Sequence, residues 1–197
     1  MISLPCGMTM PFQPDELTRL VVQALEELGV PYMMVGSLSV NFYAIPRSTQ
    51  GADFVIQMEA LTLSRLAGRL APALKLSPQS AFETVTWTTK HLFDSTDGDI
   101  PFKIEVFELS EDAHDRERFA RRRRVPFADI ATWLPTVEDV IVTKLRRSRS
   151  GRRVKDIEDV RNILAVQGDA LDWAYVHRWC VAHDTRGLLD RVRAALP

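Results

Sequence analysis

The stretch from 32 to 56 constrains the fold of this chain more than any other part of its sequence. A short apolar run at 32–35 predicts a buried strand, and the glycine and serine that follow predict the start of a helix that Pro46 ends. A second apolar run at 54–56 predicts another strand, with Asp53 at its beginning. A strand, a Gly-Ser step, a helix and a strand that carries a carboxylate together form an arrangement suited to a triphosphate and its metal ions.

The elements around this stretch predict a mixed sheet with helices between its early strands. Residues 14–28 have apolar side chains at helical spacing, acidic residues in the first turn and Gly29 directly after the end. Further elements follow from similar patterns: a helix at 61–74, a strand or hairpin arm at 82–93, a turn at 94–99 and a strand at 101–109.

The character of the chain changes after Pro135. Four helices are predicted there, with a polar joint after the first: 136–147, 154–166, 170–182 and 185–196, with the joint at 148–151. We therefore predict an α+β protein of two parts, a mixed-sheet core over 1–135 and a helical C-terminal part over 136–197. A chain of 197 residues is long enough for a core without disulfide or metal support.

Composition excludes several classes of protein. The formal net charge of −1 gives no overall attraction to nucleic acid or membrane. The basic residues gather between 121 and 155, and this region is either a solvated face or a surface for RNA, DNA or another polyanion. No apolar run is long enough for a membrane span, and no signal peptide is visible. Two cysteines, Cys6 and Cys180, suggest reduced thiols, so we expect a cytoplasmic protein without a membrane partner.

Three features could carry chemistry. Gly36 and Ser37 at a helix start offer free N–H groups and a hydroxyl to a phosphate, or they are only a helix cap. Asp53 at the start of a strand is either a turn residue or a ligand for a divalent ion. Glu105 lies on the more polar side of the strand at 101–109, where it is a second metal ligand or an exposed residue. Asp53 and Glu105 could hold Mg²⁺ together with phosphate oxygens.

Lys144 lies on the apolar stripe of the helix at 136–147. A lysine that faces inward needs a partner, which is a phosphate or an acid such as Asp156. The alternative is a lysine at the edge of the stripe whose ammonium reaches water.

Three runs of this chain resemble the nucleotidyltransferases of the DNA polymerase β-like superfamily. They are YMMVGSLSVNFYAIPRSTQGADFVIQ, FKIEVFEL and LPTVEDVIVTKLRRSRSGRRVKDIEDVRNIL, within a likeness that covers about residues 15–180. The closest likeness is to small bacterial toxin-type enzymes of the abortive-infection group. Their pattern is a strand, Gly-Ser, a helix, Arg-x-Thr, Asp-x-Asp on the next strand, a third carboxylate on a later strand, and a charged signature on helices.

The resemblance implies roles for particular residues. Gly36 and Ser37 match the phosphate-binding pair, and Arg47 and Thr49 match the Arg-x-Thr step. Asp53 matches the second metal-binding Asp. The remaining matches are Glu105 to the third carboxylate, Lys144 to the helical lysine, and Lys155, Asp156 and Asp159 to the later charged signature. The catalytic set is therefore Asp53, Glu105 and Lys144.

The departure from this pattern is Gly51, which stands where the first metal-binding Asp is expected. Loss of a ligand shared by two ions typically costs orders of magnitude in rate. Two hypotheses follow. In the first, the chain is a Mg²⁺-dependent enzyme that moves NMP from an NTP to a hydroxyl of a protein or RNA, as the toxin of a toxin-antitoxin pair. In the second, it is a weakened member of the superfamily that binds a nucleotide, RNA or a protein partner such as an antitoxin.

Overall fold

The structure is a computed structural model that describes residues 14–96, 102–127, 129–149 and 153–196. Cys6, the second half of the turn predicted at 94–99 and the end of the joint predicted at 148–151 lie outside these ranges.

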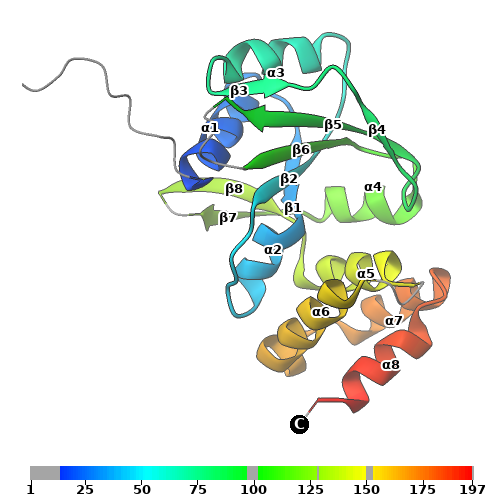
Figure 1. Cartoon of the computed structure of the whole chain (residues 1–197). Helices are drawn as coiled ribbons and strands as arrows, with labels where there is room; N and C mark the ends of the chain where they lie inside the picture. The colour runs from blue at the N-terminus through cyan, green and yellow to red at the C-terminus, as the bar shows by residue number, and fades with distance from the viewer. Residues whose placement is uncertain (1–13, 97–101, 128, 150–152, 197) are drawn as a thin grey trace, which may run out of the picture.

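A mixed sheet of six strands forms the first half of the molecule (Figure 1). Its order is β1-β2-β6-β5-β3, with β4 paired to β5, and a separate hairpin joins β7 to β8. Strands β2 and β6 run parallel, and the other pairs are antiparallel. The strands are β1 (Tyr32–Val35), β2 (Gly51–Ile56), β3 (Leu74–Leu76), β4 (Ala81–Glu83), β5 (Thr88–Ser95), β6 (Lys103–Glu108), β7 (Arg123–Phe127) and β8 (Ile130–Leu134).

Helices flank the sheet and form most of the second half of the chain. They are α1 (Pro14–Glu27), α2 (Gly36–Tyr43), α3 (Thr62–Leu70), α4 (Ala113–Ala120), α5 (Val137–Arg147), α6 (Val154–Gln167), α7 (Trp173–Ala182) and α8 (Arg186–Ala194), with a short 3₁₀ turn η1 (Gly168–Ala170) after α6. None of the helices in the described ranges is both long and apolar enough to cross a membrane.

Three predicted helices, α3, α7 and α8, are shorter than expected. Helix α3 ends at Leu70 because Pro72 follows closely and disfavours helical backbone in the residue before it. Helix α7 begins at Trp173, where the side chain of Asp172 accepts a hydrogen bond from the N–H of Tyr175. The sequence analysis also missed α4 and the β7–β8 hairpin. Helix α4 has a low apolar content, and the arginine run that leads into β7 hides its strand pattern.

The sheet divides its side chains between two faces. Alternate residues of β2, among them Phe54 and Ile56, pack under α1 and α3 in the larger hydrophobic core. The opposite face carries Val55 and Phe107, which pack with Phe119 of α4. Asp53 and Glu105 belong to this second face by alternation, so the sheet presents both carboxylates on the side away from the main core.

The helices after α4 form a second core of their own, below the sheet in Figure 1. It contains apolar residues of α5 through α8, and Val40 of α2 packs into it. Helix α2 therefore leaves the sheet at β1 and reaches the helical core (Figure 1). The predicted fold class, a mixed-sheet core followed by a helical part, is confirmed, while the division at residue 135 stays a prediction.

Candidate functional site

A cleft of about 520 Å³ lies between the second face of the sheet and the helical part. Pockets that bind small ligands commonly measure about 300–1,000 Å³, so the cleft is large enough for a nucleotide. Seven residues that the sequence analysis selected line it: Gly36, Ser37, Arg47, Thr49, Asp53, Glu105 and Lys144. Arg147, Arg153, Lys155 and Asp156 line it as well. The structure thus brings together residues that lie more than a hundred positions apart in the sequence.

The absence of a side chain at Gly36 leaves space for the Asp53 carboxylate. Its backbone has φ +69°, a left-handed conformation that side chains rarely adopt. A Cβ atom at Gly36 would lie 1.8 Å from Oδ2 of Asp53. Because Gly36 has no side chain, the Asp53 carboxylate can lie directly against the backbone at the first residue of α2.

Ser37 does not cap α2, contrary to the sequence analysis. The helix already begins at Gly36, its cap position is Val35, and no side chain caps it. Ser37 Oγ instead accepts a hydrogen bond of 3.1 Å from Nη2 of Arg47. The hydroxyl proton remains available for an acceptor in the cleft, such as a phosphate oxygen. Thr49 donates a hydrogen bond of 3.0 Å to the carbonyl of Gly51 and so holds the loop against the start of β2.

A network of ion pairs connects the loop after α2 with α5 and α6. Lys144 Nζ lies 2.7 Å from a carboxylate oxygen of Asp156 and 2.7 Å from one of Asp159. The Asp159 carboxylate also accepts two hydrogen bonds from the guanidinium of Arg47, at 2.9 and 3.0 Å. Lys144 and Arg47 hold the pKa of Asp159 below its usual range through these hydrogen bonds, although burial acts in the opposite direction. The partner of Lys144 in this structure is therefore acidic.

Asp53 and Glu105 are paired residues of adjacent strands, β2 and β6. Burial raises the pKa of Asp53 to about 6, and the negative charge of Glu105 adds to the increase. Arg147, Lys144 and Lys90 act in the opposite direction. Two neighbouring carboxylates that repel each other form a natural place for a cation.

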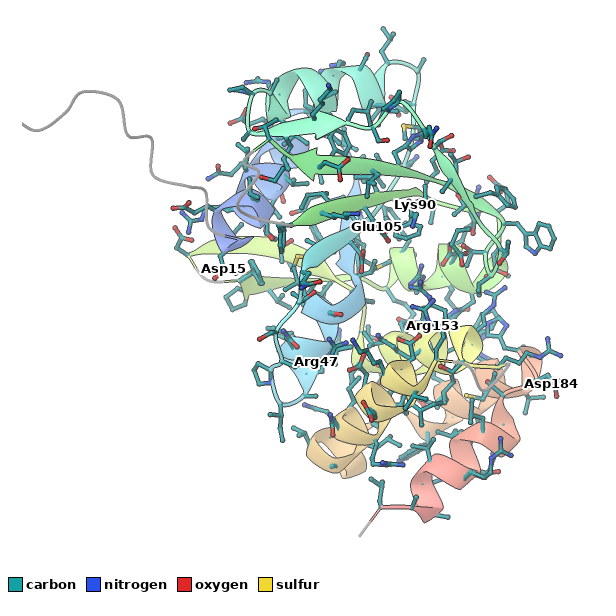
Figure 2. The ribbon with its side chains drawn as sticks, in the orientation of Figure 1. Asp15, Arg47, Lys90, Glu105, Arg153 and Asp184 are labelled. Atoms are coloured by element: carbon teal, nitrogen blue, oxygen red, sulfur yellow. The ribbon has the colours of Figure 1, made fainter. Side chains whose placement is uncertain are left out.

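Glu105 already has a cationic neighbour on the sheet. Nζ of Lys90, from β5, lies 2.7 Å from Oε1 of Glu105. Figure 2 shows the two side chains together on the sheet, with Arg47 and Arg153 on the helical side. The sequence analysis missed Lys90 because its distance from Glu105 depends on the antiparallel register of β5 and β6.

Gly51 lies on the same face as Asp53, opposite Lys103 of β6. A Cβ atom at Gly51 would lie 2.6 Å from the backbone carbonyl oxygen of Lys103, closer than real Cβ contacts. The two strands therefore pack tightly around a residue without a side chain. An aspartate at this position would require the backbone of β6 to shift.

These donors fit one divalent ion and do not fit two. Within the described residues, no group of three acidic, histidine or cysteine side chains is placed to hold a metal ion. Asp53 and Glu105 remain, and one oxygen of Glu105 is paired with Lys90. A single Mg²⁺ needs only one or two protein carboxylates when a triphosphate supplies further oxygens.

Arg147 adds a positive charge that sequence reasoning missed. It belongs to the last turn of α5 and lines the cleft, and its buried Nε has no partner among the described residues. Lys155 of α6 also lines the cleft and is exposed. Helical spacing could have found Arg147, because it follows Lys144 by three positions and so lies on the same side of α5. These cations make the cleft suited to an anion.

The fold resembles those of several solved structures. No family model matches the chain, and no curated protein matches it. Among solved structures, the antibiotic-resistance factor ANT(2'')-Ia in complex with adenylyl-2''-tobramycin has a TM-score of 0.62 and 12% identity, over 87% of this chain and 97% of that one. The solution structure of ANT(2'')-Ia has a TM-score of 0.61 and 12% identity, over 94% and 98%. This chain has a nucleotidyltransferase fold.

A third structure with the nucleotidyltransferase fold is an antigenic nucleotidyltransferase-like protein from Paracoccidioides brasiliensis. It has a TM-score of 0.53 and 18% identity, over 95% of this chain and 96% of that one. The match to the superfamily fold that the sequence analysis expected is confirmed. At these identities the likeness concerns the fold alone, and the chemistry of the cleft depends on its own residues.

Proposed function

We propose that the chain is a nucleotidyltransferase that binds an NTP with Mg²⁺ in the cleft and transfers NMP to a hydroxyl group of a protein or RNA. The observation that carries the proposal is the convergence of Gly36, Ser37, Asp53 and Glu105 in one cleft. The same cleft contains Arg147 and Lys155, cations without an ion-pair partner within the described ranges. A triphosphate is the ligand whose charge and oxygen atoms match this set.

The roles of the residues follow from their surroundings. The N–H groups at the start of α2 and the hydroxyl of Ser37 bind phosphate oxygens, and Arg47 orients that hydroxyl by its hydrogen bond. Arg147 and Lys155 neutralise further phosphate charge. Asp53 and Glu105 would hold Mg²⁺, which neutralises charge on the attacking and leaving oxygens when it is bound.

Lys144 has an indirect role in this proposal. Its ammonium is held by Asp156 and Asp159, while its position on the cleft wall keeps its positive charge near the phosphates. It thus links the binding of an anion to the ion pairs between α5 and α6.

A second function is favoured by one observation, the tight packing around Gly51. Because a Cβ atom there would contact the carbonyl of Lys103, the strands have no room for the first metal-binding carboxylate. Such a cleft could bind a nucleotide and a protein or RNA partner without transferring NMP. The two functions differ in catalysis and share nucleotide binding.

Incubation with each labelled NTP, Mg²⁺ or Mn²⁺, and cellular RNA or protein distinguishes these functions. We expect labelled product, with loss of at least about a hundredfold in Asp53→Asn because the ion loses its charged ligand. Glu111→Gln is the matched control, since Glu111 is 86% exposed and does not line the cleft. Binding of NTP without transfer would favour the second function, and absence of binding would contradict both.

We extend the first proposal to a toxin of a toxin-antitoxin pair, on the basis of the resemblance of Lys144, Lys155, Asp156 and Asp159 to the charged signature of such enzymes. Expression in a bacterial host should then arrest growth, and Asp53→Asn should relieve the arrest at equal protein level. Growth arrest that persists in Asp53→Asn would contradict an enzymatic toxin.

A further inference from the structure

Lys90 of β5 pairs with Glu105 on the sheet, next to the residues that line the cleft. Its Nζ lies 2.7 Å from Oε1 of Glu105, and the two side chains are 27% and 30% exposed. The same ammonium lies 5.7 Å from the centre of the Phe107 ring, within the range of a cation–π contact. Lys90 is therefore fixed on two sides, by a carboxylate and by an aromatic ring.

The register of the sheet explains why Lys90 reaches this place. Lys90 is opposite Phe107, and Phe107 is two positions after Glu105 on β6. Residues directly opposite on antiparallel strands share a face, and a long side chain can reach the diagonal neighbour. Asp53 is opposite Glu105 on the other side of β6, so Lys90, Glu105 and Asp53 follow one another across the same face.

We propose that Lys90 takes the place of a second metal ion, so that Asp53 and Glu105 are matched to one divalent ion and one ammonium group. Three carboxylates with two divalent ions carry one net positive charge. Asp53 and Glu105 with Lys90 and one divalent ion carry the same net charge. The loss of a carboxylate at Gly51 and the presence of Lys90 therefore compensate each other electrostatically.

This inference rests on the proposed function, because it concerns the same cleft, and it gives that function a specific metal requirement. Lys90 acts through Glu105 as a counter-ion: it occupies one oxygen, leaves the other for an ion shared with Asp53, and repels any second cation. The unaltered chain should bind one Mn²⁺ in the cleft, since Mn²⁺ accepts the same oxygen ligands as Mg²⁺.

The test is a titration with Mn²⁺ alone, followed by electron paramagnetic resonance, on the full chain and its variants. Lys90→Met keeps the length of the side chain and removes the charge. It should bind Mn²⁺ at least about tenfold more tightly, because Glu105 is released and a repelling charge is lost. Lys90→Arg should stay close to the unaltered chain. Lys75→Met, which removes an exposed lysine from β3, controls for the change in net charge.

If the Lys90–Glu105 ion pair only stabilises the fold, the titration gives a different result. Loss of the pair would lower the melting temperature of Lys90→Met without tightening Mn²⁺ binding, and that outcome would overturn the proposal. Two Mn²⁺ ions bound with similar affinity by the unaltered chain, both lost in Asp53→Asn, would overturn it too. Adding Glu105→Gln to Lys90→Met should cancel the gain. Lys90→Gln provides a second neutral variant should the methionine variant fold poorly.

The titration contains no nucleotide, so its result does not depend on the proposed transfer activity. If Lys90→Met tightens Mn²⁺ binding and the chain binds no NTP, the proposed function fails while the role of Lys90 stands. If the chain transfers NMP and Lys90→Met leaves Mn²⁺ binding unchanged, the role of Lys90 fails alone.

Discussion

At the scale of single residues, the environment of Asp53 determines what the cleft can bind. Its carboxylate lies against the backbone of Gly36 and beside the carboxylate of Glu105. Burial and the charge of Glu105 raise its pKa to about 6. The folded chain without metal therefore holds a proton at Asp53 under mildly acidic conditions, and it must lose that proton before a cation binds.

The first prediction concerns Asp53→Asn and pH. Because the pKa is raised in the folded state, the stability that this group contributes is full below about pH 4 and is lost as pH rises through about 6. In the presence of EDTA, Asp53→Asn should be more stable than the unaltered chain by about 1–2 kcal/mol at pH 7.5 and nearly equal to it near pH 4. Urea denaturation at the two pH values measures this difference, and an equal difference at both would contradict it.

The second prediction concerns Gly36→Ala. The substitution places a side chain in a left-handed conformation and forces Asp53 away, so we expect a loss of at least about 2 kcal/mol and weaker Mn²⁺ binding. Gly29→Ala is the matched control, since Gly29 has φ +65° and nothing within 4 Å of its Cβ position. Equal losses in the two variants would show that backbone strain acts alone, without the contact to Asp53. Denaturation and Mn²⁺ titration measure both effects.

At the scale of elements, α5 and α6 are joined by a lysine between two carboxylates. Lys144 is close to fully buried, and so are Asp156 and Asp159. Arg47, in the loop after α2, forms an ion pair with Asp159. Arg153, at the start of α6, forms one with Asp156. The network therefore fixes the loop, both helices and one wall of the cleft at once.

The third prediction concerns Lys144→Met. It leaves buried carboxylates with one cation each and should lower the free energy of unfolding by about 3 kcal/mol. Lys155→Met removes an exposed lysine from the same cleft and should change stability by less than about 0.5 kcal/mol. Thermal and urea denaturation compare the two variants. A Lys144→Met chain as stable as the Lys155→Met chain would mean that the ion pairs contribute little.

At the scale of the whole molecule, α2 connects two hydrophobic cores. One core lies between the sheet and the helices α1 and α3, and the other lies among α5 to α8. Val40 of α2 packs into the second core, while the helix begins directly at the end of β1. Arg47 adds the ion pair to Asp159 of α6. The cleft lies where these connections meet, so its geometry depends on both parts.

The fourth prediction is that the two parts unfold together. Differential scanning calorimetry of the full chain should give one transition whose calorimetric and van't Hoff enthalpies agree. Arg47→Met removes the ion pair to α6 and should lower the transition temperature without splitting the peak. Two resolved transitions in the unaltered chain would instead show that the core over 1–135 and the helical part over 136–197 are independent domains.

Periodicity was sufficient to predict most elements in the described ranges. It predicted α1, β1 and α5 nearly to the residue because their apolar spacing and their end signals agree. It failed at α4, where charged residues outnumber apolar ones, and at β7, whose first two residues continue an arginine run. Within the site, strand alternation and helical spacing were sufficient to find Asp53, Glu105 and Lys144, and the same helical spacing could have found Arg147. Lys90 was not accessible, because its contact with Glu105 depends on the register of β5 and β6.

The sequence by itself determined which chemical groups are available: a glycine and a serine at a helix start, an acid on each of two strands and a glycine in place of a third acid. Local spacing specifies these features because they depend on turns, helix starts and strand alternation. Only the tertiary structure decided which charges meet. The register of β5 and β6 brings Lys90 to Glu105, and the packing of α6 brings Asp159 to Arg47 and Lys144. The members of each pair lie far apart in the sequence, so they meet only because of the way in which the sheet and the helices pack.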